Sequence, residues 1–340
     1  MKRIKVAIVG YGNLGRGVRQ ALAKSPDMEL VQIITRDPKR VLREVKSMPV
    51  NDFRTFNREV DVAILCCGSK QDLFNAGSPA RPPKSLTSPA QLGQGPFFAR
   101  LFNTVDSFDT HARIPAYRRC MNAYCVMNRR TAVISAGWDP GTFSLERIMA
   151  DAFLPGSHRY TFWGPGVSQG HSDAVRRIPG VVDCRQYTLP IRSAVSRVRH
   201  GQNPKLEPGE KHTRLVYAAV QAGADKKRIE HEIKTMPNYF AGFRTRVVFV
   251  SRARLLKEHK GFPHSGFVLA SGKTGSNKGL IEYRCSWESN PEATASILVA
   301  CARACVRMNR EHKYGAWTMA DIPPAYYSSR TAAELLKDFM

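Results

Sequence analysis

The run Val6-Ala-Ile-Val-Gly10-Tyr-Gly12-Asn-Leu-Gly15 decides the fold of this chain. Apolar and β-branched residues precede the glycines over 5–9, and a helical spacing of apolar residues follows over 15–24. In a strand–turn–helix unit, the first glycine permits a tight turn, the second lets backbone approach a pyrophosphate, and the third brings the helix close to the strand. The run therefore predicts a dinucleotide-binding site, with a purely structural turn as the alternative.

The composition permits a large core and bears on the location of the protein. The chain has 340 residues, of which 43% are hydrophobic, and this size suggests two or three domains. No apolar run reaches the length of a membrane span, and the apolar stretch behind the basic start ends at Gly10, too early for a signal peptide. We therefore expect a cytoplasmic protein with no membrane partner.

The eight cysteines predict reduced, structural thiols. Cys66 and Cys67 lie in a strand of buried type, whereas Cys301 and Cys305 share one face of a predicted helix. Neither pair has the spacing of a disulfide framework, and no cluster of His and Cys completes a tetrahedral metal site. We expect no bound metal.

The charge of the chain is strongly basic. Lys and Arg number 52 against 28 Asp and Glu, which gives a formal net charge of +24. Such a balance indicates either a basic solvated surface or an acidic partner such as nucleic acid. Basic clusters such as Arg129-Arg130 and Lys226-Lys-Arg228 are scattered, and no nucleic-acid module accompanies them. We expect salt-sensitive, non-specific binding and no specific nucleic acid.

Strand-like and helix-like segments alternate over residues 1–137. The strand candidates are 5–9, 30–35, 61–67, 103–106 and 131–136. Alternation of this kind predicts an α/β fold with a Rossmann-type, doubly wound parallel sheet. The proline-rich stretch 74–95 interrupts the pattern, and we interpret it as an inserted, mobile surface loop without a regular element.

Residues 138–289 have a different pattern, typical of an α+β domain. Strand candidates lie at 159–163, 184–189, 213–220, 245–250 and 280–288, and helix candidates such as 226–235 are fewer. The pattern predicts a mostly antiparallel sheet with helices on one side. We expect the helical stretch 291–310 to return, with about 290–340, to the first domain.

Two aspartates follow predicted parallel strands. Asp109 comes after 103–106, and Asp139 after 131–136. Ligands of open α/β sheets bind beyond the carboxyl ends of the strands, where a carboxylate can hold an ammonium group beside a nicotinamide or accept its proton. The alternative for each aspartate is a helix N-cap. In the second domain, the glycine-rich, aromatic and polar stretch 162–173 is typical of a substrate loop.

Longer motifs extend nearly end to end. They are Gly10-Tyr-Gly-Asn-Leu-Gly-Arg16, Asn103-Thr-Val-Asp-Ser-Phe-Asp-Thr-His-Ala-Arg-Ile-Pro115, Gly137-Trp-Asp-Pro-Gly141, Tyr160-Thr-Phe-Trp-Gly164, Ser168-Gln-Gly-His-Ser-Asp-Ala174, Lys234-Thr-Met-Pro-Asn-Tyr-Phe240 and Pro263-His264. Together they resemble the meso-diaminopimelate D-dehydrogenase family. The resemblance implies NADP-dependent, reversible oxidative deamination of the D-centre of meso-2,6-diaminopimelate to L-2-amino-6-oxopimelate and ammonium. It also implies a homodimer and a substrate-binding and dimerisation role for 138–289.

The resemblance also assigns site residues. Asp109 and Asp139 match the acidic pair near the reacting amine; one of them is the base, and the motifs do not say which. The implied substrate-binding residues are Trp163, Gln169 and Gly170 at the reacting end, Thr188, Arg214, His264 and Asn290 at the far end, and Asp173. The implied cofactor contacts are Gly10, Gly12, Asn13, Leu14, Gly15, Thr35, Arg36, Cys67, Gly68, Ser69, Gly137, Trp138, Pro140 and Gly141. A substrate with an ammonium and a carboxylate at each end explains these polar residues, because every buried charge needs a partner.

The sequence departs from the family pattern in ways that leave alternatives open. Asp37 follows Arg36 where an acid ordinarily favours NAD, although Arg36, Lys39 and Arg40 favour the phosphate of NADP. The stretch 74–95 is an insertion near the expected cofactor path, and Arg118-Arg119 adds unusual positive charge. A broader D-amino-acid dehydrogenase and a catalytically weakened cationic relative are the alternative functions. Thr188, Arg214 and His264 argue against the former, because an apolar side chain would leave them without partners.

Overall fold

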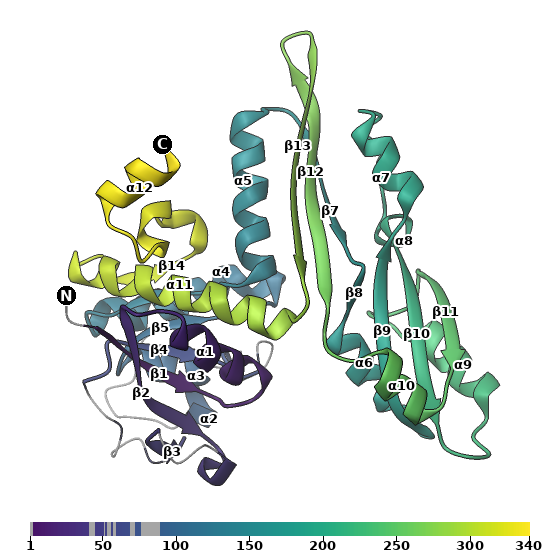
Figure 1. Ribbon diagram of the computed structural model, residues 1–340, viewed down its shortest axis with the longest axis horizontal. Helices are drawn as coiled ribbons and strands as arrows, with labels where there is room; N and C mark the ends of the chain where they lie inside the picture. Colours follow the sequence, from purple (N-terminus) through teal and green to yellow (C-terminus); the bar gives the residue numbers. More distant parts are fainter. Residues whose placement is uncertain are drawn as a thin grey trace. The chain divides into compact units, whose positions relative to one another are not determined.

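The computed structural model describes residues 3–40, 45–50, 52, 56, 59–68, 72–75 and 89–340 (Figure 1). The chain divides into two compact units. Unit 1 comprises Met1–Leu145 and Pro291–Met340, and unit 2 comprises Glu146–Asn290. Among the described residues, every helix is too short or too polar to cross a lipid bilayer.

Unit 1 is built on a seven-stranded sheet with the order β14-β6-β5-β4-β1-β2-β3. Its strands are β1 (Ile4–Val9), β2 (Met28–Thr35), β3 (Ser47–Pro49), β4 (Val62–Leu65), β5 (Asn103–Asp106), β6 (Thr131–Val133) and β14 (Gly315–Trp317). All neighbouring strands pair in parallel. The order changes direction between β1 and β4, which confirms the predicted Rossmann-type, doubly wound sheet.

Helices cover both faces of this sheet. The helical segments of unit 1 are α1 (Asn13–Ala23), η1 (Pro38–Arg40), α2 (Pro89–Leu92), α3 (Gln94–Ala99), η2 (His111–Arg113), α4 (Ile114–Met127), η3 (Trp138–Thr142), α5 (Phe143–Phe153, which continues into unit 2), α11 (Asn290–Arg310), η4 (Met319–Asp321), η5 (Pro324–Tyr327) and α12 (Ala332–Phe339). Alternate residues of β1 enter different cores: Val6 and Ile8 pack with α1 and α11, whereas Val9 packs with α3 and α4. Burial on both faces explains why β1 and β4 are largely apolar runs.

The prediction for 74–95 is wrong at both ends of the stretch. Phe74 and Leu92 are buried in the core of unit 1, and α2 begins at Pro89. The N–H of Gln94 donates to Asp72 O at 2.8 Å, and the N–H of Gly95 donates to Leu73 O at 3.0 Å. These bonds hold the ends of the stretch together. Residues 76–88, where the prediction of a mobile loop also applies, lie outside the described residues.

Unit 2 contains two sheets instead of the single sheet expected. One has the order β11-β10-β9-β8 and the other β13-β12-β7. The strands are β7 (His158–Trp163), β8 (Gly166–Val167), β9 (Val181–Pro190), β10 (His212–Val220), β11 (Arg244–Phe249), β12 (His264–Thr274) and β13 (Asn277–Trp287). Pairing is antiparallel except between β10 and β11. β12 was missed because its short apolar centre lies between Gly and Ser residues, which favour turns.

The helices of unit 2 pack on these sheets. They are α6 (Gln169–Arg176), α7 (Arg192–Arg199), α8 (Pro208–Lys211), α9 (Lys226–Thr235) and α10 (Arg252–Glu258). α9 has the predicted bounds, and its N-cap Asp225 accepts the N–H groups of Lys227 and Arg228 at 3.0 Å. Ile229 and Ile233 of α9 pack with β9 and β10 in one core, whereas α7 contributes to another with β7 and β12.

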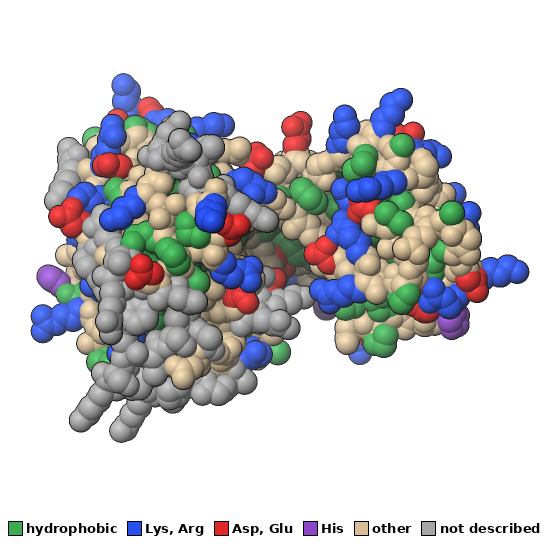
Figure 2. All heavy atoms as spheres, turned by 90° about the horizontal axis from the view of Figure 1, so that it is seen from below, with side chains coloured by type: hydrophobic (Ala, Val, Ile, Leu, Met, Phe, Trp, Pro, Cys, Tyr) green, Lys and Arg blue, Asp and Glu red, His purple; other side chains and the backbone are tan. Residues whose placement is uncertain are grey.

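The basic residues are spread over the surface. Figure 2 shows Lys and Arg side chains scattered among Asp and Glu on the face in view, without one continuous basic area. Several form exposed pairs one helical turn apart, such as Arg254 with Glu258 at 2.8 Å. All eight cysteines are free thiols, and all but Cys67 are buried.

Candidate active site

The glycine-rich turn of unit 1 has the geometry that a pyrophosphate requires. Gly10 has φ +92°, and a Cβ there would lie 2.9 Å from Cys66 O. A Cβ on Gly15 would lie 2.1 Å from Gly10 O, so α1 contacts the turn directly. Around Gly12, by contrast, no described heavy atom lies within 4 Å of an added Cβ. Gly12 therefore leaves open space at the start of α1, where backbone N–H groups bind anions.

Other predicted cofactor residues lie at the same edge of the sheet. Thr35 ends β2, and Arg36 and Asp37 after it are exposed. Cys67 and Gly68 follow β4, and the N–H of Gly68 donates to Asp72 Oδ2 at 3.0 Å. Because β2, β1 and β4 are parallel neighbours, their carboxyl ends meet at one edge. Ser69 lies outside the described residues.

Asp106, which sequence reasoning did not single out, joins two loops at this edge. Its side chain is fully buried at the end of β5. Oδ1 accepts the N–H groups of Phe108 and Ser135 at 3.0 Å each, and Oδ2 accepts the Tyr117 hydroxyl at 2.7 Å. Burial raises the pKa of Asp106, and the three hydrogen bonds oppose that rise. The available signal was a charged residue at the last position of a predicted parallel strand of the sheet.

The two candidate catalytic aspartates lie in the loops that Asp106 joins. Asp109 is half-buried, and the residue at the N-cap position of the following turn is Thr110. Asp139 is half-buried and extended, with φ −150° and ψ 108°, in η3. Helix α5 begins only at Phe143. Neither aspartate occupies an N-cap position, and both follow neighbouring strands, β5 and β6.

Residues around Asp139 include the last predicted cofactor contacts. Gly137 and Gly141 have φ +140° and +137°, values that favour glycine, and the N–H of Thr142 donates to Gly137 O at 3.0 Å. Trp138 is buried and packs edge-on against Phe143, with ring centroids 5.4 Å apart. This tight turn holds Asp139 and Pro140 at the carboxyl end of β6.

Unit 2 contains a half-buried cation held by uncharged groups. Arg214 on β10 lies opposite Thr188 on β9, and its Nη1 donates to Thr188 Oγ1. Its guanidinium lies 4.2 Å from the centroid of the Phe243 ring. Burial lowers the pKa of Arg214 to about 10, and among the residues described no hydrogen-bond partner reaches its buried Nε. A cation in this state suits a carboxylate ligand.

His264 and Trp163 lie next to Arg214 and Thr188. The Trp163 and His264 rings meet edge-on with centroids 5.8 Å apart. Gly166 on β8 pairs with Thr188, and a Cβ on Gly166 would lie 2.5 Å from His264 Nδ1. Burial lowers the pKa of His264. Strand pairing therefore brings four of the predicted substrate residues together.

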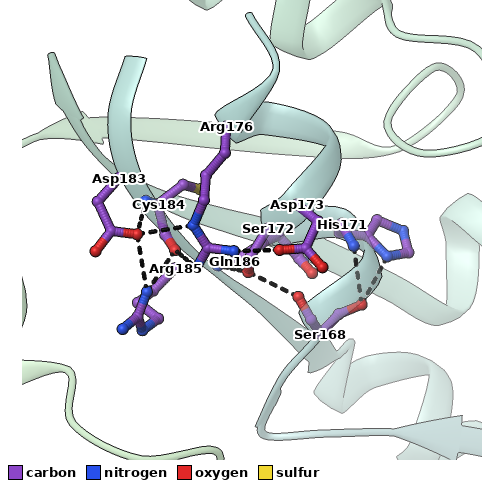
Figure 3. Close-up of polar contacts among 9 residues, drawn as sticks. All are labelled: Ser168, His171, Ser172, Asp173, Arg176, Asp183, Cys184, Arg185 and Gln186. Atoms are coloured by element: carbon purple, nitrogen blue, oxygen red, sulfur yellow. Dashed lines mark hydrogen bonds and ion pairs between the residues drawn. The ribbon is translucent and has the colours of Figure 1, made fainter. Parts of the chain in front are cut away.

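The start of α6 presents a polar group without a partner in the described structure. Ser168 is the N-cap: its Oγ accepts the N–H of His171 at 3.4 Å and lies 2.7 Å from His171 Nδ1 (Figure 3). Gln169 is the first residue of the helix, and its Nε2 is buried without a hydrogen-bond partner. Gly170 is exposed. Gln169 therefore retains a donor for a ligand oxygen.

Two predicted substrate residues have other surroundings. Asp173 is exposed on α6 and pairs with Arg176, which also binds Asp183 and Cys184 O at 2.8 Å each (Figure 3). Asn290 is half-buried, and its N–H donates to Phe262 O at 3.0 Å. The structure thus places Asp173 in an ion-pair network that attaches α6 to β9.

Comparisons with known proteins agree with this geometry. The family model "Diaminopimelic acid dehydrogenase C-terminal domain" matches residues 137–289. The meso-diaminopimelate D-dehydrogenase of Ureibacillus thermosphaericus is 48% identical to this chain over 100% of both chains. That of Corynebacterium glutamicum is 41% identical over 99% of both chains.

Two solved structures match this chain over 100% of its length and 100% of their own chains. A C. glutamicum DAP dehydrogenase in complex with DAP matches with a TM-score of 0.86 at 39% identity. An engineered D-amino acid dehydrogenase bound to NADP+ matches with a TM-score of 0.82 at 38% identity. Together with the full-length relatives, these matches identify the chain as a member of the meso-diaminopimelate D-dehydrogenase family.

Proposed function

We propose that this chain catalyses the reversible oxidative deamination of meso-2,6-diaminopimelate at its D-centre, with NADP as the electron acceptor. The substrate, NADP+ and water give L-2-amino-6-oxopimelate, ammonium, NADPH and a proton. The relatives that cover the whole chain carry this activity in their names, and one similar structure holds DAP. The sheet order and the glycine turn of unit 1 are those of a nucleotide-dependent dehydrogenase.

The proposal depends most on the surroundings of Arg214. Its half-buried guanidinium is held by Thr188 and Phe243, neither of which neutralises its charge. The carboxylate at the far end of meso-diaminopimelate would supply the missing anion and accept hydrogen bonds from the guanidinium. A substrate without that carboxylate would cover the half-buried cation without neutralising it, which is costly. The site therefore favours a long, doubly charged amino acid.

In unit 1, Asp109 and Asp139 supply the acid–base chemistry of the proposal. The D-centre must lose a proton from its ammonium group as its C–H bond breaks. One aspartate accepts that proton, and a carboxylate then assists the attack of water on the imine carbon. Bound NADP supplies the hydride acceptor. Gln169 in unit 2 has a buried Nε2–H that finds no acceptor among the described residues, which suits a carboxylate oxygen of the substrate.

The residues after β2 support NADP over NAD. Arg36 is exposed at the end of β2, and Lys39 in η1 is also exposed. Both can neutralise a 2′-phosphate, whereas Asp37 beside them would repel it and favours the ribose hydroxyls of NAD. A titration of NADP+ against NAD+ tests this choice, and we expect the lower KM for NADP+.

Rates of NADP+ reduction with different amino acids test the proposed function. We expect turnover with meso-diaminopimelate and none with its LL isomer, which has no D-centre. The second candidate, a broader D-amino-acid dehydrogenase, draws support from the similar engineered D-amino acid dehydrogenase. Equal rates with D-alanine would favour that candidate. No turnover at any pH, with tight salt-sensitive RNA binding, would favour a weakened cationic relative.

We also propose a cytoplasmic homodimer that assembles through unit 2. Eight free cysteines suit a reducing compartment. Exposed apolar side chains of unit 2, Val182, Leu280 and Trp287, are 42%, 46% and 39% exposed and suit a subunit interface. Sedimentation equilibrium should give twice the mass of the 38.0 kDa chain, and a monomer at micromolar concentration would contradict the proposal.

A further inference from the structure

A histidine that the proposed mechanism does not use connects the two sheets of unit 2. His212 is the first residue of β10, in the four-stranded sheet, and Trp163 is the last residue of β7, in the three-stranded sheet. His212 Nε2 accepts the main-chain N–H of Trp163 at 2.7 Å. A side chain of one sheet therefore fixes the backbone of the other.

The acceptor role requires a neutral imidazole. Nε2 cannot carry a proton while it accepts one from Trp163, so the single proton of the neutral ring is on Nδ1. His212 is only 5% exposed and packs edge-on against Phe162, with ring centroids 6.1 Å apart. Burial, and then the positive charges of Arg214 and Lys211, lower the pKa of His212 to about 4. The ring is therefore an acceptor at neutral pH.

The hydrogen bond lies between two groups of substrate residues. Arg214 is two residues after His212, so both side chains lie on the same face of β10. Arg214 bonds Thr188, also in the four-stranded sheet. Trp163 packs against His264, and both belong to the three-stranded sheet. The separation of Trp163 from the Arg214–Thr188 pair thus depends on the junction at His212, together with the one at β8, where the N–H of Val167 donates to Pro263 O beside β12 at 2.8 Å.

We propose that His212 is a positioning residue, which sets the separation between Trp163 and the Arg214–Thr188 pair and thereby the selectivity for an amino acid with a second carboxylate. This inference rests on the proposed function. Chemically, the substrate class is a D-configured amino acid whose far carboxylate must reach Arg214 while its reacting end meets Trp163. A shift of the Trp163 backbone would change the length of substrate that spans the distance from Trp163 to Arg214.

Two matched variants test the role of the acceptor. His212→Phe keeps an aromatic ring without an acceptor, whereas His212→Gln keeps an acceptor oxygen. We expect His212→Phe to raise the KM for meso-diaminopimelate roughly tenfold, because the main-chain N–H of Trp163 loses its partner. The preference for meso-diaminopimelate over D-alanine should fall by a similar factor, with the KM for NADP+ unchanged. His212→Gln should have a KM for meso-diaminopimelate and a preference over D-alanine close to those of wild type. Equal behaviour of the two variants would overturn the proposal.

A measurement on the unmodified protein covers the case in which His212→Phe does not fold. The imidazole ¹⁵N spectrum at neutral pH should show His212 with an unprotonated Nε2, and the Trp163 amide should exchange slowly with solvent. A protonated Nε2 in an enzyme active on meso-diaminopimelate would overturn the role of His212 alone. An unprotonated Nε2 in an enzyme inactive on meso-diaminopimelate would overturn the proposed function and, with it, the role in selectivity.

Discussion

The guanidinium of Arg214 lies 4.2 Å from the centre of the Phe243 ring, and this contact orients the cation without neutralising it. The aromatic face attracts the cation through its quadrupole, and Thr188 accepts one of its hydrogen bonds. Both partners are uncharged. The positive charge of Arg214 can therefore be neutralised by a ligand carboxylate, so a change at this residue should affect substrate binding most.

Replacement of Arg214 should abolish the preference for a second carboxylate. We expect Arg214→Met to lower kcat/KM for meso-diaminopimelate by roughly a hundredfold or more, because a charge-assisted, bidentate contact is lost. Arg214→Lys should also be impaired, since an ammonium cannot stack on Phe243 or bind a carboxylate in the same planar way. Steady-state kinetics check both variants. An unchanged KM for meso-diaminopimelate in Arg214→Met would contradict the assignment.

Two glycines of the turn should respond differently to an added methyl group. Gly15→Ala places a Cβ 2.1 Å from Gly10 O, so it should destabilise unit 1 even without cofactor. Gly12→Ala meets no described protein atom within 4 Å, so its thermal unfolding should match wild type. Its affinity for NADP+ should fall, because the new Cβ takes the space of the pyrophosphate. Normal NADP+ affinity in a well-folded Gly12→Ala variant would contradict the assigned cofactor site.

The aspartates should affect chemistry more than cofactor binding. We expect Asp139→Asn to abolish turnover, with a loss of about a hundredfold or more if it is the base, and to leave NADP+ affinity nearly unchanged. Asp109→Asn is the matched comparison, because both residues follow neighbouring strands. The base is the aspartate whose loss also removes the acidic limb of the pH–rate profile. A normal rate in Asp139→Asn would show that this residue is only structural.

His212 should make stability depend on pH. Its pKa is lowered to about 4 in the folded protein from an ordinary value of 6.5. Between these two pH values, the unfolded chain binds a proton on His212 that the folded protein does not bind. The free energy of unfolding should therefore fall as the pH drops from about 6.5 to about 4, by roughly 2 kcal/mol on reaching about pH 5. Urea unfolding of wild type and His212→Gln checks this. The two proteins should converge at acid pH, and parallel pH curves would argue against a neutral, buried His212.

The parts of the fold that local patterns specify were predictable. β5 (Asn103–Asp106) and α9 (Lys226–Thr235) have their predicted bounds, because a strand-like run between helical segments and a capped, periodic helix are local signals. The glycine turn was also predictable, because the steric need for each glycine arises within one strand–turn–helix unit. The family resemblance predicted that Thr188, Arg214 and His264 share one end of the site, and strand pairing brings these residues close to one another. It placed Trp163 at the other end, whereas the Trp163 ring contacts His264.

Features that depend on long-range pairing were not predictable. The division of unit 2 into two sheets depends on which strands pair, and strand propensity does not contain that information. The roles of His212 and Asp106 depend on partners 49 and 29 residues away in the sequence, Trp163 and Ser135. Burial of Phe74 and Leu92 was missed because the prolines between them dominate the local pattern.

The most direct test of the account compares meso-diaminopimelate with D-lysine, which lacks only the far carboxylate, in wild type and in Arg214→Met. Initial rates of NADP+ reduction give kcat/KM for each pair. We predict that wild type prefers meso-diaminopimelate by roughly a hundredfold or more and that Arg214→Met loses most of this preference. The same preference in both proteins would show that Arg214 does not bind the far carboxylate, and would contradict the central claim.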